Sequence, residues 1–177
     1  MWLCPPILAR LVGEPWLLNR DWLPILLGVI LVNGIAEEVI HRGFVFGHLR
    51  ETRSFRTSAT ISAVLFAAQH VYLLITIGAI AGPASMALAL AVAFPLALLY
   101  EAGGNSLGAP AILHTSSNAP MLLFVVPQAT GAVLLPYMAV VLASMYLVFA
   151  FRPWLRTEGC NGASGTRSSR CSITWRL

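Results

Sequence analysis

Between residues 57 and 151 the chain carries a single formal charge, that of Glu101. Over all 177 residues, 58% are hydrophobic and 10% are charged. A soluble domain usually has about 25% charged residues, so this composition indicates a membrane protein. Within a bilayer the backbone satisfies its own hydrogen bonds most simply as a helix of about 20 apolar residues. The sequence therefore predicts an all-α fold, a polytopic transmembrane bundle of roughly five to six membrane helices.

Glycine, proline and charged residues divide the chain into segments. Residues 1–20 are apolar but broken by prolines and charges, which predicts a partial span or an interfacial segment. The core is expected over 21–151, with helices at 21–47, 57–80, 84–100, 109–126 and 133–151 and turns at 81–83 and 127–132. Glu101 is expected near a helix start, where an acid complements the helix dipole. Residues 152–177 lack an apolar period and predict a basic, disordered cytoplasmic tail.

The arginines indicate how the chain is oriented in the bilayer. Three of them lie in the short segment 48–56, and Arg152 and Arg156 follow the last predicted span. Arginine-rich loops favour the cytoplasmic side. Placing 48–56 there puts both arginine-rich ends on one side and leaves the two external turns uncharged. Orientation thus explains the net charge of +4, so the expected partner is the lipid bilayer and nucleic-acid binding is not expected.

A few strongly polar groups remain inside the predicted spans. They are Glu37, Glu38, His41, Arg42, Gln69, His70, His114 and Asn118. Ionisable groups at membrane depth are costly and usually functional. On one helix, Glu38 and Arg42 have the spacing and order of a favourable ion pair, and Glu37 with His41 forms a neighbouring stripe. His114 and Asn118 have the same four-residue spacing on another helix.

Three of these residues are expected at a similar depth. At about 1.5 Å per residue, Glu37 lies roughly 15 Å from the cytoplasmic end of its helix, His70 roughly 20 Å and His114 roughly 12 Å. Groups meeting there can share a proton, a water molecule or a metal ion. The set suits hydrolysis, since a buried carboxylate can take a proton from water and a histidine can pass it on. An imidazole and an amide can donate to a developing oxyanion.

Three short motifs now stand on successive apolar helices. EEVIHR (37–42) fits the pattern EExxxR, FAAQH (66–70) fits FxxxH, and HTSSN (114–118) fits HxxxN. In this order they resemble the CPBP intramembrane proteases, also called the Abi or CAAX-protease family, which include the type II CAAX prenyl endopeptidase. The resemblance covers residues 22–126 and, more loosely, the following span. It implies an intramembrane endopeptidase.

The resemblance also implies roles for individual residues. Glu37 is expected to activate the water, with His70 sharing that role, and His114 and Asn118 are expected to form the oxyanion site. Glu38 and Arg42 are expected to hold the helix and tune Glu37. The family picture needs no metal, so no cofactor is expected, with a Zn²⁺ site of Glu37, His70 and His114 as the alternative. His41 departs from the family pattern, which commonly has an aromatic residue before the motif arginine.

Other readings of the same polar cluster remain open. The alternative is a chain that keeps the scaffold without the chemistry, as a membrane immunity or interaction protein of the bacteriocin self-immunity type. A small transporter is disfavoured because no inverted repeat is evident. For an enzyme, the expected substrate is a membrane-associated peptide or small protein. An arginine-only, compact chain looks bacterial, so we expect the inner membrane, with the active site toward the cytoplasmic side.

Overall fold

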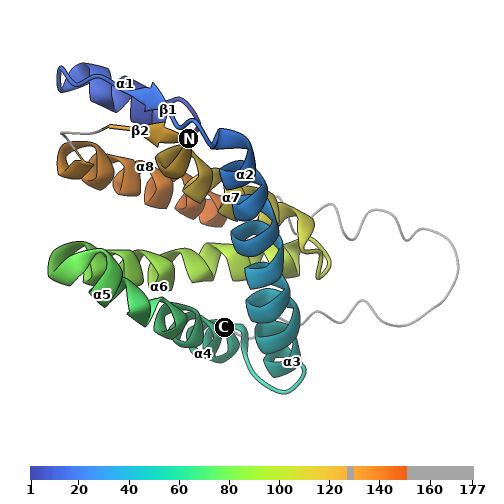
Figure 1. Ribbon diagram of the computed structural model, residues 1–177. Coiled ribbons are helices and arrows are strands. Elements are labelled where there is room, and N and C mark those ends of the chain that lie inside the picture. The colour runs from blue at the N-terminus through green and yellow to red at the C-terminus, as the bar shows by residue number, and fades with distance from the viewer. Residues whose placement is uncertain (127–129, 151–177) are drawn as a thin grey trace, which may run out of the picture.

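The fold is seen in a computed structural model that describes residues 1–126 and 130–150 (Figure 1). The predicted tail, 152–177, and residues 127–129 of the predicted turn at 127–132 lie outside the described residues. The elements in chain order are α1 (Cys4–Leu11), β1 (Leu17–Leu18), α2 (Trp22–Gly28), η1 (Val29–Ala36), η2 (Val39–Phe46), α3 (Gly47–Arg50), α4 (Phe55–Ala68), η3 (Gln69–Tyr72), α5 (Leu73–Thr76), α6 (Gly78–Ala102), α7 (Gly108–Leu123), β2 (Phe124–Val125) and α8 (Thr130–Ala150).

The predicted all-α helical bundle is confirmed. Four helical stretches of the described chain are long and apolar enough to cross a membrane: Trp22–Arg50, Phe55–Thr76, Ala81–Ala102 and Ala132–Ala150. The other two predicted segments form shorter helices. Of these, α7 lies among the long helices, and α1 packs against α7 and α8. The strands β1 and β2 form one short antiparallel pair that ties the residues after α1 to the end of α7.

The first span contains wide helical turns that the sequence period does not predict. Its backbone is π-helical over η1 and again over η2, and Glu37 and Glu38 stand between these two stretches. Such turns widen the helix and change the direction in which successive side chains point, and they are frequent at functional sites. The predicted helix is thus present, but its α-helical spacing does not hold throughout.

A glycine lets the first span lie close to α7. A Cβ atom added at Gly34 would collide with the side-chain oxygen of Thr115 and would lie 3.2 Å from the carbonyl oxygen of Ala111. Both of these residues belong to α7. The absence of a side chain at position 34 therefore lets η1 contact the helix that carries the third motif.

The turn predicted at 81–83 is wrong. The chain reverses at Ile77 and Gly78 instead, where Gly78 has φ of +92°, and α6 runs through Gly82 and Pro83. The missing Cβ of Gly82 has a packing role, because an added one would lie 2.8 Å from the backbone of Leu73 and Leu74. Gly82 thus lies at a close contact between α6 and α5, and Pro83 lies inside α6, so neither residue forms a turn. Membrane helices tolerate such prolines because their neighbours satisfy the freed carbonyls.

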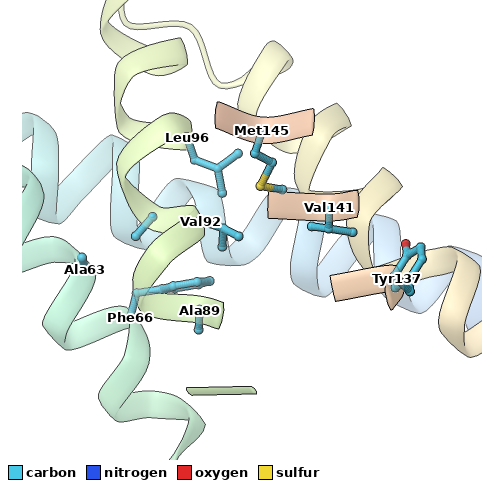
Figure 2. Close-up of a cluster of buried hydrophobic side chains, with 9 residues drawn as sticks. Ala63, Phe66, Ala89, Val92, Leu96, Tyr137, Val141 and Met145 are labelled. Atoms are coloured by element: carbon cyan, nitrogen blue, oxygen red, sulfur yellow. The ribbon is translucent and has the colours of Figure 1, made fainter. Parts of the chain in front are cut away.

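An apolar cluster holds the second, third and last spans together (Figure 2). It joins Ala63 and Phe66 of α4 to Val92 and Leu96 of α6, and it reaches Met145 of α8. Many large apolar side chains point outward instead, as Ile75 does with 89% of its surface exposed. A lipid-facing surface of this kind is expected for a bundle in a bilayer. Phe66 links this cluster to the polar groups described next.

Candidate active site

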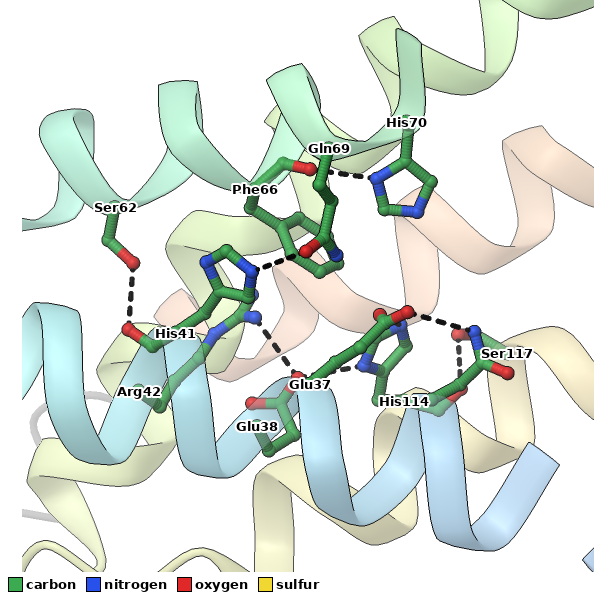
Figure 3. Close-up of polar contacts among 11 residues, drawn as sticks. Glu37, Glu38, His41, Arg42, Ser62, Phe66, Gln69, His70, His114 and Ser117 are labelled. Carbon is green, nitrogen blue, oxygen red and sulfur yellow. Dashed lines mark hydrogen bonds and ion pairs between the residues drawn. The ribbon is translucent and has the colours of Figure 1, made fainter. Parts of the chain in front are cut away.

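Glu38 is the buried centre of the polar cluster (Figure 3). Its Oε1 atom lies 3.1 Å from a guanidinium nitrogen of Arg42 and 2.7 Å from Nδ1 of His114. The side chains of Arg42 and Glu38 are 1% and 0% exposed. Since a carboxylate can only accept, Nδ1 of His114 carries the proton in this contact. The predicted Glu38–Arg42 ion pair is present, and it continues into the third motif.

Glu37 lies on the other side of the same histidine. Its Oε2 atom is 3.8 Å from Nε2 of His114, and its Oε1 accepts a hydrogen bond of 3.4 Å from the side-chain amide of Asn33. Within the described chain, Oε2 is buried and has no hydrogen-bond partner. Oε2 of Glu38 also lacks a hydrogen-bond partner in the described chain, so the two glutamates differ in their other oxygen. Oε1 of Glu38 is held by a cation and an imidazole, whereas Oε1 of Glu37 has only the longer bond from Asn33.

His70 belongs to the tight 3₁₀ turn η3, directly after α4. Its Nδ1 atom lies 2.7 Å from the carbonyl oxygen of Phe66. A carbonyl only accepts, so Nδ1 donates and Nε2 is left with its lone pair in the neutral ring. His70 and His114 are thus held in the same way, each through Nδ1. Figure 3 shows the His70 ring on the side of α4 that faces Glu37 and His114.

A cavity of about 350 Å³ lies beside these groups. His70, His114 and Asn118 line it together, with Asn33 at its wall. Glu37 is not among its lining residues, although both of its neighbours, Asn33 and His114, are. Much of the remaining wall is apolar and comes from α5, α6, α7 and α8, including Leu73, Leu88, Ala89, Val92, Met121, Leu122, Leu134, Met138 and Val141. The structure therefore places the FxxxH and HxxxN motifs at one partly apolar space, and Glu37 of the EExxxR motif lies next to it through Asn33 and His114.

Phe66, the first residue of the FxxxH motif, contacts side chains of all three motifs. Its ring makes edge contacts with His70 and His114 at centroid distances of 5.0 and 5.6 Å. The guanidinium of Arg42 lies over its face, 4.6 Å from the centroid. A cation over an aromatic face is favourable where water is excluded. The aromatic residue of this motif thus contacts both histidines and supplies a second partner for the buried arginine.

His41 and Glu101 have other partners than the sequence suggests. His41 shares a predicted stripe with Glu37, yet its Nε2 atom lies 2.8 Å from the side-chain oxygen of Gln69. Glu101 stands at the end of α6, not at a helix start, so that prediction is wrong. It binds Arg50 with both carboxylate oxygens, at 2.9 and 2.7 Å.

Sequence reasoning missed three further polar residues. Asn33 lies four residues before Glu37, a spacing that could have identified it as a partner. Ser117 donates to the carbonyl oxygen of His114 at 2.7 Å, and Tyr137 of α8 donates to the carbonyl of Ser117 at the same distance. Nothing in the sequence pairs Tyr137 with Ser117. Together these bonds tie the HxxxN segment to the last helix.

The arrangement of the side chains bears on the alternative of a metal site. Across residues 1–126 and 130–150, no group of three His, Cys, Asp or Glu side chains has an arrangement that could hold a metal ion. Nδ1 of His114 is held by a carboxylate and Nδ1 of His70 by a carbonyl oxygen, which leaves Nε2 of each ring open, as in many metal-binding histidines. As the side chains lie, however, Glu37, His70 and His114 do not form a metal-binding group, so we derive no step through a metal. That no cofactor is needed stays a prediction.

Comparison with known proteins identifies the family. The model of the family described as type II CAAX prenyl endopeptidase Rce1-like matches residues 19–120, which include all three motifs. No curated protein and no solved structure matches the chain. The match covers more than half of the sequence and extends from just before the first span to the end of the HxxxN motif. The chain is therefore an integral membrane protein that belongs to the Rce1-like family of CAAX-type intramembrane proteases.

Proposed function

We propose that this chain is an intramembrane endopeptidase in which Glu37 activates a water molecule to hydrolyse a peptide bond. The observation that carries this proposal is the difference between the two oxygens of Glu37. One is held by Asn33, and the other is buried, without a hydrogen-bond partner in the described chain, 3.8 Å from His114. A general base needs such an open, positioned acceptor next to a group that can relay a proton.

The reaction can be followed atom by atom. Glu37 takes a proton from water, and the resulting hydroxide adds to the carbonyl carbon of the substrate. The amide of Asn118 donates to the oxygen on which negative charge develops, and His114 does so from Nε2 when that atom is protonated. When the C–N bond breaks, the proton held by Glu37 passes to the leaving nitrogen, directly or through Nε2 of His70. One water is consumed, and a new carboxylic acid and a new amine are formed, after which the acid loses its proton to the amine or to water.

Glu38 and Arg42 act through His114 in this scheme. Glu38 holds Nδ1 of His114 at 2.7 Å, which turns Nε2 toward Glu37. Arg42 provides the charge that makes a buried carboxylate tolerable at this place. These are positioning roles, and neither side chain lines the cavity.

The substrate is expected to be a membrane-associated peptide or protein with an apolar side chain next to the scissile bond. The cavity beside the histidines is lined mainly by aliphatic and methionine side chains, which suit such a group. The arginine-rich loop after Arg50 favours the cytoplasmic side of a bacterial inner membrane. A substrate would then enter from the bilayer or from the cytoplasmic surface.

Comparative membrane proteomics of wild-type and Glu37→Gln cells tests this function. We expect at least one membrane peptide to accumulate uncut in Glu37→Gln cells while the protein is inserted at normal levels. Glu51→Gln is the matched control, because Glu51 follows the same span and its side chain is 71% exposed. Identical peptide profiles in all three strains would overturn the proposal. A phenotype that survives Glu37→Gln would instead favour the non-catalytic immunity or interaction role.

A further inference from the structure

His41 contacts one face of the second span at three levels. Its carbonyl oxygen accepts a hydrogen bond of 2.8 Å from the hydroxyl of Ser62, and its ring lies 4.9 Å from the ring of Phe66, edge to face. Its Nε2 atom lies 2.8 Å from the side-chain oxygen of Gln69. Residues 62, 66 and 69 follow the helical spacing of a single face. His41 therefore connects the helix of the EExxxR motif to the helix of the FxxxH motif (Figure 3).

The last of these contacts is made where the second span changes its geometry. Gln69 is the first residue of the 3₁₀ turn η3, and His70 is the second. Within a helix, a tight turn of this kind often marks a functional position. In this turn the His70 ring donates to the carbonyl of Phe66, one turn back. The orientation of His70 thus depends on a local distortion that begins at Gln69.

The side chains of His41 and Gln69 have few other hydrogen-bond partners within reach. Gln69 is exposed on a membrane-spanning helix, where hydrocarbon offers its amide oxygen no donor. His41 is buried, and its Nδ1 atom has no hydrogen-bond partner in the described part of the chain. The bond between Nε2 of His41 and Gln69 is therefore the one that satisfies this ring. Each side chain stabilises the place of the other.

We propose that His41 and Gln69 form an interhelical clasp that holds the η3 turn and thereby positions His70 relative to Glu37. This inference rests on the proposed function and adds two positioning residues to it. Neither side chain lines the cavity, and the two are bonded to each other, so we expect both to position other residues. The clasp acts through its neighbours: Gln69 precedes His70 in the turn, and Phe66 contacts the rings of both His41 and His70.

The first test reads the state of His70 without relying on activity. Nitrogen-15 NMR of histidine-labelled protein in lipid nanodiscs reports which ring nitrogen carries the proton, and His70→Asn identifies the signals. We expect wild-type His70 to be protonated at Nδ1. In His41→Phe, which keeps a ring beside Phe66, and in Gln69→Leu, which changes an exposed position, the His70 signals should shift toward mixed tautomers. His48→Phe is the control, because His48 is on the same span with 75% of its side chain exposed.

The second test measures cleavage in the same variants. A positioning role predicts that His41→Phe and Gln69→Leu each lower kcat by roughly 10- to 100-fold while KM stays near the wild-type value. The kcat of the double variant should be no lower than that of the less active single variant, because each substitution alone already removes the bond between His41 and Gln69. His48→Phe should cleave normally.

The two tests separate failure of the clasp from failure of the proposed function. Unchanged His70 signals in both His41→Phe and Gln69→Leu would overturn the clasp, even if Glu37→Gln abolishes cleavage. Additive losses in the double variant would also contradict it. Shifted His70 signals together with full cleavage by Glu37→Gln would keep the clasp and refute the proposed role of Glu37.

Discussion

Two arginines of the first span, Arg42 and Arg50, each pair with a glutamate, and the two pairs differ in their burial and in their further contacts. Arg42 and Glu38 are almost fully buried, sit one turn apart and make a single contact of 3.1 Å. Arg50 and Glu101 are 25% and 13% exposed, join the ends of two spans and meet through two hydrogen bonds. The better geometry thus belongs to the more exposed pair. The buried pair instead continues into His114, a residue of the third motif.

This difference separates a structural pair from one that serves the site. Burying two charges costs several kcal/mol, and one ion pair seldom recovers that cost. A pair used only for stability would be placed like Arg50 and Glu101, where desolvation is partial. The position of Glu38 is explained by what else it binds, because its carboxylate orients His114 between the two glutamates. We therefore expect the two pairs to respond differently to mutation.

The largest effect on stability is expected from Arg42→Met. It leaves Glu38 buried beside His114 without its cation, which should cost about 3–5 kcal/mol of unfolding free energy. The measurement is thermal or denaturant unfolding of the purified protein in detergent micelles. The double variant Glu38→Leu/Arg42→Met should regain much of this stability but no activity, since it removes both charges and the acceptor of His114. If Arg42→Met lowered the free energy of unfolding no more than Arg50→Met, the distinction between the two pairs would be contradicted.

A smaller loss of stability is expected from Gly34→Ala, which tests the contact that brings the first and third motifs together. The new Cβ would collide with the Thr115 hydroxyl, and overpacking of this kind costs about 1–3 kcal/mol. Gly34→Ala/Thr115→Ala removes the colliding oxygen and should recover most of the loss in the same unfolding assay. Gly28→Ala is a control, because an added Cβ there meets nothing within 4 Å. If Gly34→Ala and Gly28→Ala were equally stable, the close approach of the first span to α7 at Gly34 would be contradicted.

The smallest effect is expected from Arg50→Met. This pair is partly exposed, and such pairs contribute about 0.2–1 kcal/mol. A double-mutant cycle with Glu101→Gln isolates the pair from the other contacts of the two side chains. Peptidase activity should remain near wild type, since the pair lies far along the span from Glu37. If the coupling energy of Arg50 with Glu101 were as large as that of Arg42 with Glu38, solvent exposure would not explain the difference between the two pairs.

Parts of this arrangement follow from the sequence by simple rules. Apolar length predicts the long helices, and the four-residue spacing predicts the Glu38–Arg42 pair. Counting residues along the predicted helices gives Glu37 and His114 a similar depth, and the structure brings them within 3.8 Å. Each of these features depends on distance along one helix axis, which the sequence encodes directly.

Other contacts depend on how helices rotate about their axes and approach one another, which residue counting does not give. The wide turns around Glu37 and Glu38 change which side chain faces α7, so Glu38 rather than Glu37 makes the short contact with His114. The bond of His41 with Gln69 and the pairing of Glu101 with Arg50 join residues far apart in the sequence. The reading of 81–83 as a turn fails for a similar reason, since Gly82 serves a contact between helices.

Cleavage and unfolding measured together on Glu37→Gln and Glu38→Gln test most directly whether the adjacent glutamates have different tasks. The substrate would be the membrane peptide that accumulates uncut in Glu37→Gln cells. We expect Glu37→Gln to lose cleavage while unfolding at the wild-type temperature, because Glu37 holds no buried cation. Glu38→Gln should lose stability as well as activity, because Arg42 is left without its carboxylate. Retained cleavage by Glu37→Gln would contradict the proposed role of this residue.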